Sequence, residues 1–277
     1  MKVGIVGLGL MGGSLGLALQ KTKIVSTVSG WDLSEAHKNE ALELGLVHEI
    51  ADISTMKQNC DIVVLAIPVE AIIATLKNDL FDAPSNLTII DFGSTKRAIL
   101  DAVPDSIRGN FVAAHPMAGT EYSGPKAAFS SLYDGATVIF CDPELTTDRH
   151  AMRAVELFSH IGMKIVFMSA AEHDHHTAII SHLPHAISFS LASGVLQQEE
   201  RRHIVALGGP TFSGMIRVAK SSPVMWSDIF KQNEDELISA IDMFSDELAR
   251  LKGLVASKDW QGVGEFMRKA RKIREIL

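Results

Sequence analysis

The sequence predicts an α/β fold in which a sheet domain, residues 1–169, precedes an all-α domain, residues 170–277. Short apolar runs alternate with helix-forming stretches up to about Ser169, which is typical of a doubly wound sheet with helices on both faces. Beyond that residue the strand-like runs stop and helix formers dominate. A G-x-G-x-x-G motif also follows the first apolar run directly, as in Rossmann-type dinucleotide-binding domains. A length of 277 residues suits two medium-sized domains.

Seven strands are predicted from near-continuous apolar runs, a pattern that favours a parallel sheet covered on both faces. They are residues 3–6, 27–31, 62–67, 87–90, 111–114, 137–140 and 164–167. The helical half carries a heptad-like apolar seam at Leu237, Ile241, Phe244, Leu248, Leu251 and Val255. Either an intramolecular bundle or a subunit interface would bury this seam, since so small a helical domain has a limited core of its own.

Composition excludes several classes of protein. The net charge of −7 carries no block of like charge, which argues against nucleic acid as a partner. Cys60 and Cys141 lie far apart without metal-ligand spacing, as expected of a reduced cytoplasmic protein. The N-terminus lacks the features of a signal peptide, and the apolar runs are interrupted well short of about 20 residues. We therefore expect neither secretion nor a membrane span.

A cofactor site is predicted at the N-terminus. The motif is Gly7-Leu8-Gly9-Leu10-Met11-Gly12, it opens a helix-compatible run, and Asp32 ends the next strand twenty residues later. In this arrangement the glycines admit a tight turn and the close approach of a pyrophosphate to the helix N-terminus. A carboxylate at Asp32 would bind both ribose hydroxyls of NAD and repel the 2′-phosphate of NADP, so NAD is expected. Ile67 and Pro68, at the end of the third strand, are expected to shape the wall beside the cofactor or to be structural only.

A chemical site is predicted where two later strands end, because ligands of open α/β sheets collect beyond the carboxyl ends of the strands. Ser94 follows one of these strands and His115 follows the next. His115 is the expected general base, since an imidazole can take the proton of a substrate hydroxyl while the cofactor takes hydride. Ser94 is either its partner or a turn residue.

Polar residues in the helical half add a substrate site. His182 and His185 are three residues apart and are expected to share a helix face, and Pro184 is expected to kink the helix there. The histidine-rich segment 173–185 lacks H-E-x-x-H, so no metal is expected. Arg217 stands in an otherwise apolar stretch, which indicates either an anionic partner or a residue at the helix edge.

Three motifs together resemble the prephenate/arogenate dehydrogenases of tyrosine biosynthesis. They are the glycine motif with Gly13-Ser14-Leu15, then His115-Pro116-Met117-Ala118-Gly119-Thr120-Glu121, then Ser181-His182-Leu183-Pro184-His185. They occur in the order typical of that family and span nearly the whole chain. The resemblance implies an NAD-binding domain, a helical dimerisation domain and a cytoplasmic homodimer.

The resemblance also implies a role for individual residues. It implies that His115 is the base, that Ser94 assists it, that Glu121 controls access and that Arg217 binds a substrate carboxylate. His182 and His185 would then line the pocket. Trp226 resembles an interface tryptophan of the family, and Asp174 resembles an acidic residue that reaches across the dimer.

The reaction implied is NAD-dependent oxidative decarboxylation of prephenate. Arogenate, which carries an amino group in place of the side-chain keto group, is an alternative substrate that the sequence does not separate from it. A β-hydroxyacid dehydrogenase is a further alternative, with Lys220 as its lysine, but it would leave the two histidine motifs unexplained. A redox-sensing NAD-binding regulator would need no base, so His115 with Ser94 argues against it.

Overall fold

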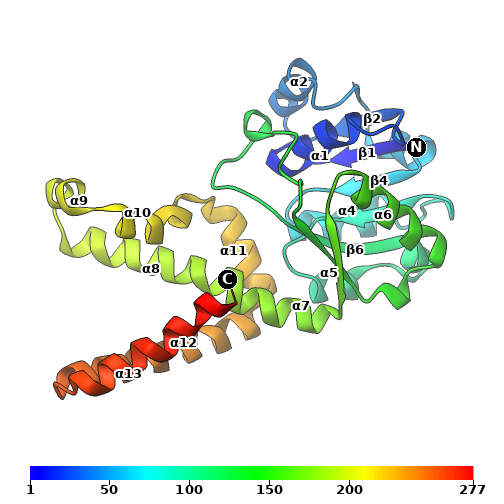
Figure 1. Ribbon diagram of the computed structural model, residues 1–277. Coiled ribbons are helices and arrows are strands. Elements are labelled where there is room, and N and C mark those ends of the chain that lie inside the picture. The colour runs from blue at the N-terminus through cyan, green and yellow to red at the C-terminus, as the bar shows by residue number, and fades with distance from the viewer. Residues whose placement is uncertain (277) are drawn as a thin grey trace.

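The computed structural model describes residues 1–276. Figure 1 shows a sheet flanked by helices on one side of the molecule and an elongated group of helices on the other. All strands belong to one sheet, in the order 3-2-1-4-5-6-7-8. The strands are β1 (Lys2–Val6), β2 (Thr27–Trp31), β3 (Glu49–Ile50), β4 (Ile62–Leu65), β5 (Thr88–Asp91), β6 (Phe111–Met117), β7 (Thr137–Cys141) and β8 (Lys164–Met168).

The sheet confirms the seven predicted strands and corrects their direction at one edge. Strands β1 to β6 pair in parallel, but β7 runs antiparallel to β6, and β8 is parallel to β7. The connection from β6 to β7 contains one short 3-10 turn, η2 (Pro125–Ala127), and no α-helix. A parallel pair would need a longer connection that crosses over a face of the sheet. The short connection between β6 and β7 makes no such crossover, so β7 runs antiparallel beside β6. The two-residue strand β3 is too short to give a sequence pattern.

Helices cover both faces of the sheet. Those of the sheet part are α1 (Leu10–Gln20), α2 (Glu35–Glu43), α3 (Ile53–Asn59), α4 (Val69–Asn78), α5 (Arg97–Ala102) and α6 (Asp148–His160). Alternate residues of β4 enter different cores: Ile62 and Val64 pack with α1 and α6, whereas Val63 and Leu65 pack with α3, α4 and α5. Both faces of a strand are thus buried, which explains the continuous apolar runs in the sequence.

The helical part begins with a long, interrupted helix. It consists of α7 (Ala170–Thr177), a π-helical turn η4 (Ala178–His182) and α8 (Leu183–Gln198). Ser169 and Glu172 form a capping box that starts it. Pro184 lies in the first turn of α8, where its missing N–H is tolerated, and the irregularity takes the form of a π turn directly before it.

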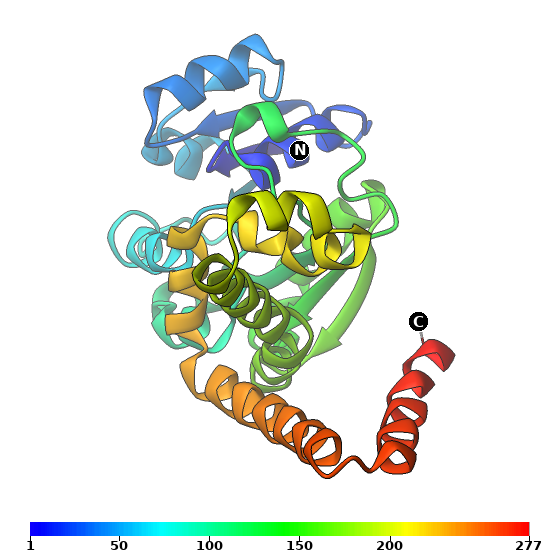
Figure 2. The same ribbon diagram turned by 90° about the vertical axis from the view of Figure 1, so that its left-hand side faces the viewer.

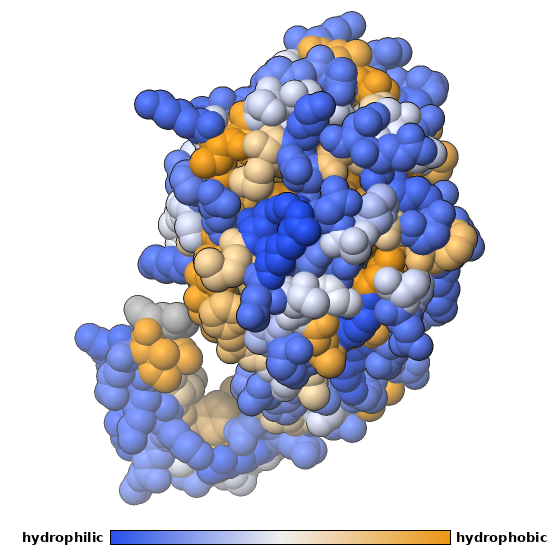
Figure 3. Space-filling view, turned by 90° about the vertical axis from the view of Figure 1, so that its right-hand side faces the viewer, coloured by the Kyte–Doolittle hydropathy of each residue, from blue (hydrophilic) through white to orange (hydrophobic). Residues whose placement is uncertain are grey.

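The remaining helices complete the helical part. They are α9 (Arg201–Leu207), α10 (Pro210–Ile216), α11 (Pro223–Gln232), α12 (Glu234–Ala256) and α13 (Trp260–Ala270), with the 3-10 turn η5 (Arg217–Lys220) between α10 and α11. Among them, α11 packs against α4 of the sheet part. Figure 2 shows α12 and α13 projecting below the sheet part, and Figure 3 shows the largely hydrophilic face of the molecule on the side away from α8 to α10.

Much of the apolar surface of the helical part is exposed in a single chain. Its buried apolar cluster is small and consists of Ala178, Leu183 and Ala240 with a few partly buried neighbours. Along the predicted seam Leu237 is buried, but Ile241, Leu248 and Val255 are exposed. The seam is therefore incompletely covered by the chain's own helices.

One helix, Ala170–Gln198, is long and apolar enough to cross a membrane by length and composition, with a mean hydropathy of 1.3 over its most apolar window. The same helix carries buried polar residues, among them His173 and Asp174, which contact the sheet part. These contacts identify it as a helix of the folded protein.

Candidate active site

The glycine turn joins β1 to α1 in a form that suits a dinucleotide. Gly7 adopts φ +96°, and a Cβ on Gly12 would lie 1.8 Å from the carbonyl oxygen of Gly7. Both positions thus require glycine. A Cβ on Gly9 would meet nothing within 4 Å, so this side of the turn is open to a ligand. Leu10 and Met11 begin α1, whose first N–H groups face the turn and suit a pyrophosphate.

Asp32 lies at the end of β2, beside this turn. Its carboxylate accepts hydrogen bonds from the backbone N–H of Leu8 (2.8 Å) and of Ser34 (2.9 Å). The glycine turn and the acidic residue therefore hold each other in place. Ile67 also packs against the turn, since its Cγ2 would lie 2.7 Å from a Cβ at Gly7, and Pro68 caps α4.

His115 lies on β6 rather than after it, two residues beyond the last pair with β5. Beyond that pair, side chains take over the hydrogen bonds that β5 would make to the backbone of β6. The carboxylate of Asp91 accepts from the N–H of Ala114 (3.1 Å), and Nζ of Lys96 donates to the carbonyl of Ala114 (2.8 Å). Asp91 and Lys96 also form an ion pair with no exposure to solvent. This pair fixes the backbone directly before His115, and breaking it would leave a buried charge, at a cost of about 3–5 kcal/mol.

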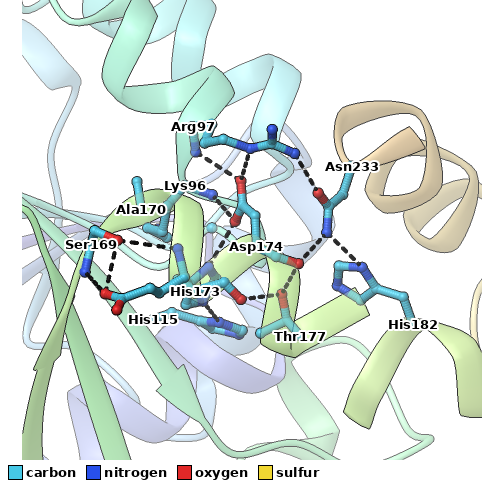
Figure 4. Close-up of polar contacts among 12 residues, drawn as sticks. Lys96, Arg97, His115, Ser169, Ala170, His173, Asp174, Thr177, His182 and Asn233 are labelled. Atoms are coloured by element: carbon cyan, nitrogen blue, oxygen red, sulfur yellow. Dashed lines mark hydrogen bonds and ion pairs between the residues drawn. The ribbon is translucent and has the colours of Figure 1, made fainter. Parts of the chain in front are cut away.

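A chain of three side chains starts at His115. Its Nδ1 lies 2.7 Å from Nε2 of His173, and Nδ1 of His173 lies 2.7 Å from Oδ1 of Asp174 (Figure 4). A carboxylate only accepts, so His173 donates through Nδ1 and accepts at Nε2. His115 then donates through Nδ1, which leaves Nε2 of His115 with a free lone pair. That atom can accept a proton.

Burial and backbone amides set the charges of this relay. Burial lowers the pKa of His115 well below 6.5, with His173 and Lys96 contributing in the same direction. Burial opposes ionisation of Asp174, but hydrogen bonds from His173 and from the backbone N–H groups of Arg97 and Lys96 outweigh it and lower its pKa. The relay thus pairs a neutral base with an ionised carboxylate at neutral pH.

A second group lies on the helical side. The imidazole of His185 stacks on Trp226 with ring centroids 3.5 Å apart, and His182 meets the edge of the same indole at 6.1 Å. The two histidines therefore share a neighbour, as the sequence predicted for one helix face. Burial lowers the pKa of His182 to about 4.

Arg217 reaches toward the loop that follows β6. Its Nη1 lies 3.1 Å from Oε2 of Glu121, and more than half of its side chain is exposed. An ion pair between these residues crosses from the helical part to the loop after β6. A guanidinium so placed can exchange this carboxylate for that of a ligand.

Comparisons with known proteins follow the same division of the chain. The model for the prephenate dehydrogenase nucleotide-binding domain matches residues 15–167, and that for the prephenate dehydrogenase dimerization domain matches residues 169–269. The chain belongs to the prephenate dehydrogenase family. This agrees with the resemblance seen in its motifs.

Similar proteins cover nearly the whole chain. A prephenate dehydrogenase of Bacillus subtilis is 33% identical over 99% of this chain and 75% of its own length. A cyclohexadienyl dehydrogenase of Zymomonas mobilis is 32% identical over 99% of this chain and 95% of its own. The crystal structure of an Aquifex aeolicus prephenate dehydrogenase, in complex with hydroxyphenyl propionate and NAD⁺, matches with a TM-score of 0.91 and 28% identity, covering 99% and 97% of the two chains.

Two features of this family member differ from the expectations. Asp174 is fully buried within its own chain, so the expectation that it reaches across a dimer is wrong for this arrangement. Ser94 lies half-buried in the turn between β5 and α5, and no side-chain hydrogen bond joins it to His115 among the residues described. The partner of His115 is His173 instead.

Several residues of the site were not predicted from the sequence. His173 lies in a histidine cluster that was interpreted only with respect to metal binding, and no role was predicted for Asp91, Lys96 or Asn233. Their common property is burial of a polar side chain, with no exposure for any of the four. The adjacent His173-Asp174 pair was the one visible signal.

Proposed function

We propose that this chain catalyses the NAD-dependent oxidative decarboxylation of prephenate to 4-hydroxyphenylpyruvate. The observation that carries the proposal is the His115–His173–Asp174 relay on β6 and α7, in the sheet whose first strand leads into the glycine turn. A relay of this kind presents an unprotonated Nε2 that can take the proton of a substrate hydroxyl while NAD takes the hydride. Membership of the prephenate dehydrogenase family supports it.

NAD fits the residues at the N-terminal turn. Gly7, Gly9 and Gly12 give the pyrophosphate room, and Asp32 stands where a ribose would bind, with Ile67 and Pro68 beside it. When bound, NAD supplies the acceptor for the hydride that leaves C4 of the substrate ring. The carboxylate of Asp32 favours a free 2′-hydroxyl over a phosphate.

His115 supplies the base. Its Nε2 takes the proton of the ring hydroxyl as the carbonyl forms, and His173 and Asp174 stabilise the imidazolium through Nδ1. Loss of CO₂ then restores the aromatic ring. Ser94, in the turn between β5 and α5, assists at the same hydroxyl.

Arg217 anchors a carboxylate of the substrate, and Glu121 occupies the guanidinium until substrate replaces it. His182, His185 and Trp226 line the pocket on the helical side. These residues come from both parts of the chain. We place the boundary between the two domains between residues 169 and 170, after the end of β8 and at the start of α7.

The chain is proposed to act as a cytoplasmic homodimer. The exposed apolar residues of α12, among them Ile241, Leu248 and Val255, support burial against a second copy. Two free, buried cysteines are consistent with a reducing compartment.

Arogenate is the second candidate substrate, favoured by the similarity to a cyclohexadienyl dehydrogenase, a name that describes the ring common to both compounds. The deciding experiment incubates the purified protein with NAD and either prephenate or arogenate and follows NADH absorbance. We expect the larger kcat/KM with prephenate. NADH formation with neither compound would refute the proposal, and a preference for arogenate would reassign the substrate.

A further inference from the structure

Asn233 is a buried asparagine at the start of α12 whose side chain does not cap that helix. It is the N-cap residue of α12, where asparagine normally accepts a hydrogen bond from the first turn of the helix. Its side chain makes no such bond, and it has no exposure to solvent. The amide points away from α12, toward α7 and η4 (Figure 4).

Three contacts fix the orientation of this amide. Nη2 of Arg97 donates to Oδ1 of Asn233 (3.1 Å), and Nδ2 of Asn233 donates to the backbone carbonyl of Asp174 (2.7 Å). A guanidinium only donates and a carbonyl only accepts, so the oxygen and the nitrogen of the amide cannot be exchanged. The nitrogen therefore also faces Nδ1 of His182, at 3.3 Å.

The tautomer of His182 follows from this orientation. An amide N–H that faces Nδ1 requires a lone pair there, so the single proton of the neutral ring is on Nε2. We propose that Asn233 is a positioning residue that holds His182 as the Nε2–H tautomer, so that His182 presents a hydrogen-bond donor to the substrate. The inference rests on the proposed function, since prephenate offers carboxylate and keto oxygens that can only accept.

His182 and His115 then have opposite roles. Nε2 of His115 carries no proton and accepts one from the ring hydroxyl, whereas Nε2 of His182 carries a proton and binds an acceptor. Asp174 takes part in fixing both tautomers, because its carboxylate accepts a hydrogen bond from His173 and its backbone carbonyl accepts one from Asn233.

The groups around His182 leave its ring neutral. Asp174 favours protonation, whereas burial, His173 and His185 oppose it, and the resulting pKa is about 4. Arg97 is separated from the ring by Asn233. Above about pH 5 the position of the proton is therefore decided by a hydrogen-bond partner and not by net charge.

The test replaces Asn233 by aspartate, which has the same shape but only accepts. The new carboxylate draws a proton to Nδ1 of His182 and raises the pKa of that ring. The charged ring still donates from Nε2, but on deprotonation it loses that donor. We expect KM for prephenate to rise at least about tenfold near neutral pH, because a buried acceptor is left unpaired, with a smaller change in kcat.

The pH profile separates this role from a structural one. In Asn233→Asp the deficit in kcat/KM relative to wild type should narrow in acid and widen as the pH rises through the new pKa. Asn110→Asp is the matched control, since its amide also donates to a backbone carbonyl, that of Pro84, on η1 (Asp105–Asn110) at the start of β6. A deficit that is the same at every pH, or an unchanged KM, would overturn the proposal.

A spectroscopic readout does not depend on activity. In protein labelled with ¹⁵N-histidine, the His182 ring, assigned with His182→Gln, should show a protonated Nε2 in wild type and a protonated Nδ1 in Asn233→Asp. Asn233→Ala, for use if the aspartate variant does not fold, should lose the single tautomer and raise KM at every pH. A wild-type ring protonated at Nδ1 would overturn the inference. Inactivity of the wild type would instead refute only the proposed function.

Discussion

Nε2 of His173 lies 2.7 Å from Nδ1 of His115, so the residue predicted to act as base is held by a second imidazole and not by a serine. The second imidazole comes from α7 and the first from β6. The base is thus set in its reactive tautomer only when the sheet part and the helical part are packed together.

Replacing His115 by asparagine should remove the proton acceptor and keep the size of the side chain. We expect kcat to fall about 10²- to 10⁴-fold with little change in KM for prephenate, because the base acts in the transition state. Steady-state kinetics measure this. His160→Asn, on the exposed end of α6, should leave both constants unchanged. Turnover near wild type in His115→Asn would show that another group is the base.

Asp174→Asn should weaken the relay without removing the base. The amide cannot accept from every donor now facing the carboxylate, which are His173, two backbone N–H groups and Nε of Arg97. We expect kcat to fall by more than about tenfold and the protein to lose stability, because buried donors lose their acceptor. Kinetics and thermal unfolding measure the two effects, with the exposed Asp246→Asn as control. Wild-type kcat in a folded Asp174→Asn variant would contradict the relay.

Arg217→Ala should act on substrate binding. The guanidinium is more than half exposed and holds Glu121, so its loss should raise KM for prephenate by about tenfold or more and leave kcat less affected. Glu121→Gln should do the opposite and lower KM, since it frees the guanidinium. Arg149→Ala, exposed on α6, is the control. An unchanged KM in Arg217→Ala would assign the anchor to another residue.

Asp32→Asn should relax the choice of cofactor. The amide keeps the size of the side chain and removes the charge that repels a 2′-phosphate, so the ratio of kcat/KM for NAD to that for NADP should fall. Asp61→Asn is a matched control, because Asp61 also accepts a backbone N–H, that of Lys2, away from the glycine turn. An undiminished preference for NAD would mean that another feature selects the cofactor.

Stability should decline in acid. Burial lowers the pKa of His115, His173, His182 and His185 below 6.5. Each ring therefore binds a proton more readily in the unfolded chain, whose histidines titrate near about 6.5. Their contribution is complete above that pH and is lost as the pH falls. Tm should drop between about pH 7 and pH 5, less so in His182→Gln. A Tm that stays level over this interval would contradict burial of neutral rings.

Patterns of apolar residues and glycine predicted the fold because they report burial and backbone geometry directly. The seven strands and Gly7, Gly9 and Gly12 are local features of this kind. The reversed β7 was not predicted, because strand direction depends on the path of the connection and not on the strand's residues. The relay was not predicted either. His173 lies 58 positions from His115, and only packing of α7 against β6 brings them together.

The π turn Ala178–His182 restricts the number of residues that this helix can contain. His182 follows His173 by nine positions, and an unbroken α-helix would rotate by about 900° over that distance, which puts the two residues on opposite sides. The wider π turn changes the direction in which His182 projects from the helix, and in that direction His182 contacts Asn233 and Trp226. Deleting or inserting one residue between Thr177 and Leu183 would turn all later side chains of α8 by about 100°. The number of residues in this segment is thus as critical as their identity.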